Sequence, residues 1–195
     1  MIIIGLKGLS VAGRVRSDGI DYYATPEWAT EELIKRESFD GLILEPCSGA
    51  GAISNVLERE GYEVISSDIR EDDHIYGDKG VDLLQIESTP AKNIITNPPF
   101  FMAMESVEKS LELVPDGGKV AMILKIQFLE GQKRYKFFQD TPLRRVYVFS
   151  KRVVFWNELI QTDESNRSKH GGTICFAWYV WEKGYTGKPE IEWIL

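Results

Sequence analysis

Residues 42–51 read LILEPCSGAG, a short apolar run that leads directly into a glycine-rich turn. A run of this length, followed by a turn and a helical pattern, is typical of a strand and helix in an α/β protein. Gly49 and Gly51 permit a tight turn and let a ligand approach the backbone closely. The segment therefore predicts a strand, a ligand-binding turn and a helix from about residue 52 to residue 60.

Strand and helix patterns alternate on both sides of this unit. We expect further strands at 62–66, 81–84, 93–96, 119–125, 146–149 and 173–181, and further helices after Thr25-Pro26, at 102–114 and at 133–139. Thr25 is the expected N-cap of the first helix, with Pro26 at its first position. This order predicts a mainly parallel sheet with helices on both faces. Ligands of such sheets bind beyond the carboxyl ends of the strands.

Length and composition favour one domain spanning 1–195, with an irregular arm at 1–20 and a mobile loop at 157–172. The chain has two cysteines and no apolar run of the ~20 residues that a membrane span needs. We therefore expect a cytoplasmic protein without a membrane partner. The net charge is -7, yet residues 125–152 hold eight Lys or Arg and two acids. That segment is compatible with phosphate contacts, and equally with a solvated basic helix face.

The sharpest signal is Asn97-Pro98-Pro99-Phe100, directly after the apolar run at 93–96. Asn97 and Pro98 both precede a proline, so both are held extended. The side-chain oxygen of Asn97 and the carbonyl of Pro98 could together accept the two N–H bonds of an unreactive exocyclic amine and aim its lone pair. Phe100 adds a flat face for a base. The alternative is a proline-rich strand exit that ends in a core phenylalanine.

Glu45 and Pro46, at the start of the glycine turn, help to indicate which class of ligand the turn binds. A dinucleotide-binding fold would show GxGxxG, but Ser54 stands where the third glycine belongs. An acid at the strand end suits an ammonium group, such as that of S-adenosylmethionine, and would repel a pyrophosphate. The segment therefore favours S-adenosylmethionine over NAD.

Two aspartates follow at the expected distances. Asp68 ends the next strand, where an acceptor for ribose hydroxyls belongs in this fold class, although it could equally be a turn residue. Asp82 could accept from an adenine amine while Leu83 lines the ring, with Asp73 and Asp78 as close alternatives.

These blocks, in this order, resemble the S-adenosylmethionine-dependent amino-methyltransferases that act on DNA adenine, in the small gamma-like or phage-type arrangement. The resemblance implies a Rossmann-like class I methyltransferase fold, with a seven-stranded sheet whose last strand, 173–181, runs antiparallel. It also implies site residues. The catalytic set is Asn97, Pro98, Pro99 and Phe100, and the cofactor-binding set is Ala24, Thr25, Glu45, Cys47, Gly49, Gly51, Asp68, Ile69, Asp82 and Leu83.

A flipped target base also needs aromatic contacts. Phe155 lies where the family places its second base-stacking aromatic, and its neighbour Trp156 could serve the same purpose. With two cysteines and two histidines in the chain, no metal site is expected. A separate target-recognition region is not evident, and the candidates for one are the arm at 1–20 and the loop at 157–172. We therefore expect a short or relaxed recognition sequence, or help from a partner.

The leading hypothesis is therefore methylation of the N6 amine of adenine, in DNA ahead of RNA, by a monomer or weak homodimer. Methylation of a protein glutamine amide is a second possibility, because that nitrogen has the same delocalised lone pair. Phe100, where such enzymes usually have Tyr, disfavours it. The third is a cofactor-binding or nucleic-acid-binding module without turnover.

Overall fold

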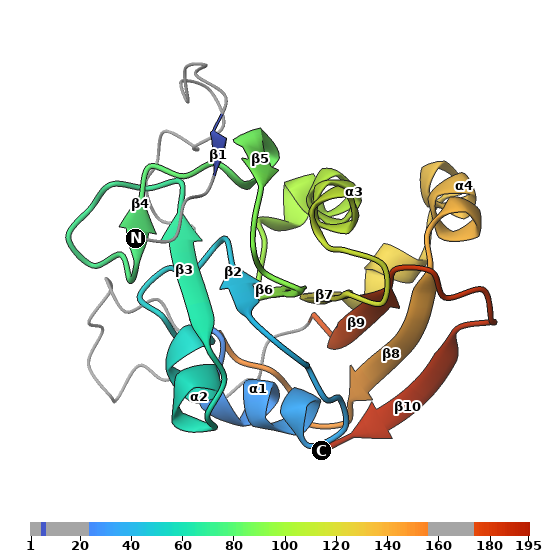
Figure 1. Ribbon diagram of the computed structural model, residues 1–195. Helices are drawn as coiled ribbons and strands as arrows, with labels where there is room; N and C mark the ends of the chain where they lie inside the picture. The colour runs from blue at the N-terminus through green and yellow to red at the C-terminus, as the bar shows by residue number, and fades with distance from the viewer. Residues whose placement is uncertain (1–4, 7–23, 156–173) are drawn as a thin grey trace.

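The computed structural model describes residues 5–6, 24–155 and 174–195 (Figure 1). Trp156, the loop at 157–172 and most of the arm at 1–20 lie outside the described residues. In chain order the elements are β1 (Gly5–Leu6), α1 (Glu27–Ile34), β2 (Ile43–Glu45), α2 (Ser54–Arg59), β3 (Val64–Asp68), β4 (Asp78–Lys79), η1 (Leu83–Gln85), β5 (Ile86–Ser88), β6 (Asn93–Thr96), η2 (Phe100–Met102), α3 (Ala103–Leu113), β7 (Lys119–Lys125), η3 (Ile126–Leu129), α4 (Gln132–Asp140), β8 (Leu143–Phe149), β9 (Phe176–Glu182) and β10 (Glu190–Ile194).

One large sheet organises the described chain. Its strand order is β10-β8-β9-β7-β6-β2-β3-β4, and β1 pairs with β5 in a separate two-stranded sheet. Every pairing in the large sheet is parallel except those of β9 with β7 and with β8. The predicted mainly parallel α/β sheet is therefore confirmed.

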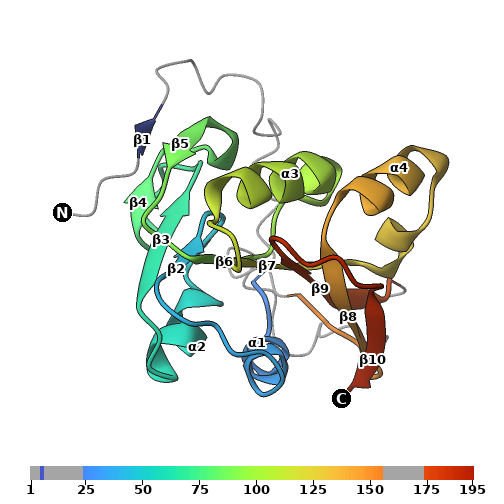
Figure 2. The ribbon, with the colours of Figure 1, turned by 45° about the vertical axis from the view of Figure 1, so that its right-hand side comes forward.

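Helices cover both faces of this sheet (Figure 2). Side chains of each central strand alternate between two buried clusters, as the two-residue period of a strand requires. On β7, Met122 belongs to the same buried cluster as Val107 of α3 and Phe137 of α4, while Ile123 belongs to the cluster that includes Leu33 of α1 and Leu57 of α2. We call these sides the α3/α4 face and the α1/α2 face.

Three details of the strand prediction were wrong. The large sheet has eight strands rather than seven, because Glu190–Ile194 adds a strand beside β8. The antiparallel strand, β9, is consequently not the last one. The expected strand at 81–84 is instead the short helical turn η1, because the carboxylate of Asp82 accepts the Leu84 N–H at 2.9 Å and closes a turn there. The sheet position is taken by β4, two exposed residues paired through their backbone with Ser67 and Asp68.

The predicted N-cap of the first helix was also wrong. α1 begins at Glu27, and its N-cap position is Pro26, with extended backbone angles (φ -60°, ψ 137°) and no side-chain capping bond. Thr25 is buried and its hydroxyl is used elsewhere, as described below.

Candidate functional site

The candidate site lies at the point in the large sheet where the order in which the chain forms its strands reverses. From β2 the chain proceeds outward to β3 and β4, then returns to β6 on the other side of β2. Two neighbouring strands that lead their loops to opposite sides leave a crevice at their carboxyl ends, which is the usual ligand position in such sheets. The glycine turn after β2 and the Asn97 segment after β6 both start at this point. The structure thus brings the two strongest sequence motifs together.

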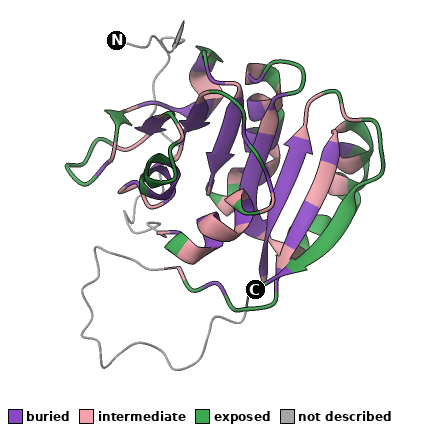
Figure 3. Cartoon of the chain, turned by 60° about the horizontal axis from the view of Figure 1, so that its bottom comes forward, coloured by how far each residue is buried: buried purple, intermediate pink, exposed green. Residues whose placement is uncertain are grey.

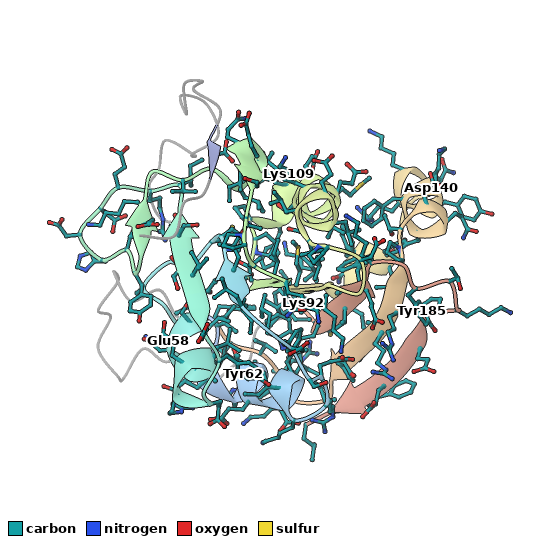
Figure 4. The ribbon with its side chains drawn as sticks, viewed as in Figure 1. Glu58, Tyr62, Lys92, Lys109, Asp140 and Tyr185 are labelled. Atoms are coloured by element: carbon teal, nitrogen blue, oxygen red, sulfur yellow. The ribbon has the colours of Figure 1, made fainter. Side chains whose placement is uncertain are left out.

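The glycine turn is held by backbone bonds to the β3 side of the sheet. The Ser48 N–H donates to Ser67 O at 2.9 Å, and the Tyr76 N–H donates to Gly49 O at 2.8 Å. Gly49 and Gly51 have φ of 55° and 85°, the left-handed region. A Cβ on Gly51 would lie 2.7 Å from Cγ of Tyr76, so that glycine is required by the ring as well as by its backbone angle. Figure 4 labels Glu58 on α2, which accepts the Tyr76 hydroxyl at 2.7 Å.

Glu45 points into the protein rather than toward an open site. It is 1% exposed, and its Oε2 accepts both the N–H of Ser54 at 2.8 Å and the Ser54 hydroxyl. The Ser54 hydroxyl also contacts the Ser66 hydroxyl at 2.6 Å. Burial raises the pKa of Glu45 to about 8, against the lowering effect of the Ser54 bonds. Glu45 is therefore mainly protonated at neutral pH and ties β2 to the start of α2. Contact with a ligand ammonium stays a prediction.

Asp68, at the carboxyl end of β3, orders the loops on both sides of it. It is 5% exposed, and its two oxygens accept the N–H of Gly49 and the N–H of Arg70, each at 2.9 Å. The Arg70 guanidinium also binds this carboxylate, at 3.1 Å from Nε to Oδ1. A ligand hydroxyl would reach Asp68 by displacing that side chain, which is the more exposed of the two partners.

The segment after the end of β3 contributes three further residues that the resemblance assigns to the cofactor, namely Ile69, Asp82 and Leu83. The Val81 N–H donates to Asp68 O at 2.9 Å, which places the Asp82 segment beside the end of β3. Asp82 and Leu83 are each 6% exposed, and Ile69 is half-buried. Leu83 belongs to the cluster of the α3/α4 face.

Asn97 follows β6 and is held by Thr25, two residues before the start of α1. Its Nδ2 donates to the hydroxyl of Thr25 at 3.2 Å. Because the amide is planar, this bond turns the Asn97 oxygen away from Thr25. Pro98 is buried and Pro99 is exposed, and Pro99 O accepts the Met102 N–H at 2.9 Å to begin η2. Thr25, one of the residues that the resemblance assigns to cofactor binding, therefore lies beside Asn97, and its role toward the cofactor stays a prediction, as does that of Ala24.

Phe100 belongs to an aromatic cluster that joins the segment after β8 to β9. Its ring centroid is 5.5 Å from that of Phe176 and 6.3 Å from that of Phe155, and Phe155 and Phe176 are 4.6 Å apart. The Lys125 ammonium lies 4.9 Å from the Phe100 centroid. The structure thus places Phe155 next to Phe100, and the role of Phe155 in stacking a base stays a prediction.

Sequence reasoning missed four residues of this region, namely Ser54, Tyr76, Lys125 and Phe176. A signal existed for Lys125, since it ends the strand beside β6, and for Ser54, which occupies the third glycine position of the dinucleotide motif. Nothing local marks Tyr76 or Phe176.

Cys47, which follows Glu45-Pro46 in the turn, is half-buried. Burial raises the pKa of its thiol well above the usual range, so it stays protonated at neutral pH. Within the described residues, no three His, Cys, Asp or Glu side chains gather as ligands for a metal ion. None of the described helices is both long and apolar enough to cross a membrane.

Comparison with known proteins gives likeness in structure alone. No protein-family model matches the sequence, and no curated protein sequence matches it. A candidate RNA methyltransferase from Pyrococcus horikoshii superposes with a TM-score of 0.61 at 16% identity, covering 91% of this chain and 92% of that one. The modification subunit of a candidate type I restriction enzyme from Vibrio vulnificus gives 0.58 at 12% identity, over 91% of this chain and 48% of that one.

The description of a third solved structure states its fold class. A candidate class I S-adenosylmethionine-dependent methyltransferase from Listeria monocytogenes gives a TM-score of 0.50 at 14% identity, covering 95% of this chain and 67% of that one. The predicted Rossmann-like class I methyltransferase fold is therefore confirmed. Sequence identities this low support a shared fold and give no information on the substrate.

Proposed function

We propose that this protein transfers a methyl group from S-adenosylmethionine to the exocyclic N6 amine of adenine in DNA. The observation that carries the proposal is the placement of Asn97. It follows β6 at the switch point of a class I methyltransferase sheet, is followed by two prolines, and has its amide nitrogen engaged by Thr25. The proposal treats residues 1–195 as one methyltransferase domain that reads a short DNA sequence.

The polar groups at the site fit most of this cofactor. In this proposal Asp68 accepts the ribose hydroxyls once Arg70 swings aside, and Asp82 accepts from the adenine amine, with Ile69 and Leu83 beside the ring. Gly49 and Gly51, both at positive φ, add no side chains to the turn, and Gly51 also leaves room for the Tyr76 ring. Glu45 fits less well as a partner for the ammonium group, because its carboxyl is protonated and bonded to Ser54. When bound, the cofactor supplies an electrophilic methyl group on a sulfonium.

The chain's own contribution is to make a poor nucleophile reactive. The N6 lone pair of adenine is delocalised into the ring. Asn97 Oδ1 and the Pro98 carbonyl accept the two N–H bonds, which draws the nitrogen toward tetrahedral geometry and directs its lone pair. Positioned acceptors of this kind lower the barrier without reorganising during the reaction. Neither acceptor is basic, so the proton that the amine loses after transfer passes to solvent.

Phe100 and Phe155 hold the base in this scheme. Stacking on an aromatic ring is worth about 1–3 kcal/mol per base. Lys125 covers one part of Phe100 in this structure, and a base would take its place over the ring. RNA is a second candidate polymer, because the Pyrococcus horikoshii neighbour is described as an RNA methyltransferase.

Transfer of labelled methyl groups tests the proposal. The purified protein is incubated with labelled S-adenosylmethionine and, separately, with DNA, RNA and a glutamine-containing peptide, and adenine products are identified by mass. We expect N6-methyladenine in DNA, and a loss of about 10²–10³-fold in kcat for Asn97→Ala, the usual cost of one positioned donor or acceptor. Asn55→Ala, an exposed asparagine on α2, is the matched control.

Other results of this labelling assay would change or reject the proposal. Label in RNA alone would replace DNA as substrate, and label in the peptide alone would favour glutamine methylation. Cofactor binding by calorimetry without label in any arm would reject the enzymatic proposal. Wild-type kcat in Asn97→Ala would reject the mechanism.

A further inference from the structure

The strand β10 ends the large sheet with an open edge. Its single partner among the described strands is β8, in parallel register from Glu190↔Arg145 to Ile194↔Phe149. Figure 3 shows β10 as an exposed ribbon along the margin of the sheet. An open edge presents a row of unpaired N–H and C=O groups, and proteins that stay monomeric usually block such edges with charged side chains, above all lysine, or with proline or a bulge. Glu190–Ile194 contains no lysine, proline or bulge, and its charged side chains, Glu190 and Glu192, are both ion-paired within the chain.

This edge is apolar on one face. Ile194 is buried on the α1/α2 face, so the alternating residues point to the α3/α4 face. These are Ile191, 53% exposed, and Trp193, 69% exposed, and Leu195 follows the strand at 78%. Large apolar side chains at an open strand edge are typical of an interaction surface.

The two acids of β10 are neutralised within the same chain. Arg145 Nε lies 3.1 Å from Glu190 Oε2, and Arg36 Nε lies 3.3 Å from Glu192 Oε1. These exposed ion pairs link β10 to the rest of the chain and offset part of the negative charge at this edge.

We propose that β10 pairs antiparallel with β10 of a second copy of this chain, about a two-fold axis at Trp193. In antiparallel pairing, directly opposite residues share a face. With Trp193 opposite itself, Ile191 lies opposite Leu195 of the second copy, so all three exposed apolar side chains meet apolar ones. A register centred on Glu192 would oppose two like charges, which destabilises a pair of strands.

The surface is self-complementary, as a two-fold interface requires. Each aromatic or aliphatic cross-strand pair contributes modestly, and two short strands bury less than the ~1,200–2,000 Å² of a standard stable interface. We therefore expect a reversible dimer whose population rises with concentration. The pairing does not involve the candidate methyl-transfer site.

Cysteine crosslinking tests both the contact and its register. A residue on the two-fold axis faces its own copy, with Cβ atoms about 4.5–5.5 Å apart, close to disulfide geometry. Under mild oxidation we expect Trp193→Cys to form a covalent dimer at least tenfold faster than Tyr135→Cys. Tyr135 on α4 is 72% exposed and is the matched control. The wild-type protein shows how much crosslinking arises from Cys47 and Cys175. Equal rates for the two variants would overturn the proposal.

The register is tested by mixing. Ile191→Cys mixed with Leu195→Cys should give a mixed disulfide, whereas each variant alone should not. Crosslinking of Ile191→Cys with Trp193→Cys instead would overturn the axis at Trp193.

Sedimentation of the unmodified protein gives the second measurement. Wild type should shift from monomer toward dimer with rising concentration, and Trp193→Asp should stay monomeric while Tyr135→Asp behaves like wild type. Because Trp193 is largely exposed, its replacement should leave the circular dichroism spectrum unchanged, which checks that loss of dimer is not loss of fold. A wild type that remains monomeric at every concentration would overturn the proposal.

Discussion

The side-chain nitrogen of Asn97 donates a hydrogen bond to the hydroxyl of Thr25 at 3.2 Å. This bond joins the carboxyl end of β6 to the residue before Pro26, at the entry to α1. It also explains why Thr25 does not cap α1, since the hydroxyl that would serve the helix N-terminus faces Asn97 instead. A residue that looks like a helix cap in the sequence is therefore a positioning residue for the candidate catalytic amide.

The first prediction concerns this bond. Thr25→Val keeps the shape of the side chain and removes the hydroxyl, so the Asn97 amide loses one anchor. We expect kcat at saturating cofactor to fall about 2–10-fold, the equivalent of a neutral hydrogen bond of about 0.5–1.5 kcal/mol. Thr25→Ser keeps the hydroxyl and should retain most of the activity. Equal kcat for wild type and Thr25→Val would show that Asn97 needs no support from α1.

The sequence predicted the parts of the fold that hydrophobic pattern controls. The strands at 93–96 and 119–125 have the predicted bounds, because each has consecutive buried apolar side chains at its centre. β4 could not be predicted, since Asp78 and Lys79 are both exposed and only backbone pairing makes them a strand. β10 did carry a signal, the alternation of Glu and Ile or Trp, which has the period of a strand.

The candidate site also has a part that the sequence predicted and a part that it did not. Motifs local in sequence, such as the glycine turn and Asn97 to Phe100, predicted where the site lies. The contacts that orient it join residues far apart in the chain, as with Asn97 and Thr25 or Gly51 and Tyr76. No local pattern encodes such pairs. The same holds for buried Glu37, a loop residue that binds Lys119 of β7 and Arg145 and Tyr147 of β8.

A second prediction separates cofactor binding from catalysis. Asp68→Ala removes the proposed acceptor for the ribose hydroxyls and should weaken cofactor affinity by about 1–3 kcal/mol, measured by calorimetry. Turnover at saturating cofactor should fall far less than in Asn97→Ala. Arg70→Ala keeps the carboxylate and removes the group that occupies it, so its affinity should equal or exceed that of wild type. Weak binding in Arg70→Ala with normal binding in Asp68→Ala would reverse our assignment.

A third prediction tests why the turn needs Gly51. Gly51→Ala forces an L residue to φ near 85° and puts its Cβ against the Tyr76 ring. The backbone strain alone costs about 1–2 kcal/mol. Gly61 has φ of 88° with nothing within 4 Å, so Gly61→Ala carries the strain without the contact. In urea unfolding, Gly51→Ala should be clearly less stable than Gly61→Ala. Equal losses would mean that Tyr76 yields without cost.

The last prediction follows from the protonated state of Glu45. Its pKa is about 8 in the folded protein, against 4.5 for an exposed glutamate. Between these values the folded protein holds a proton that the unfolded chain has released, so the free energy of unfolding falls as pH rises from 4.5 to about 8. One pKa unit corresponds to about 1.4 kcal/mol, so the contribution of Glu45 to this loss is on the order of a few kcal/mol. Glu45→Gln stays neutral and can still accept from Ser54, and should therefore remove most of that slope in unfolding measured across this pH range. Glu63→Gln, an exposed glutamate at the entry to β3, is the control and should keep the wild-type slope. If Glu45→Gln and Glu63→Gln lose stability with pH to the same extent, Glu45 is ionised in the folded protein and is available to an ammonium ligand after all.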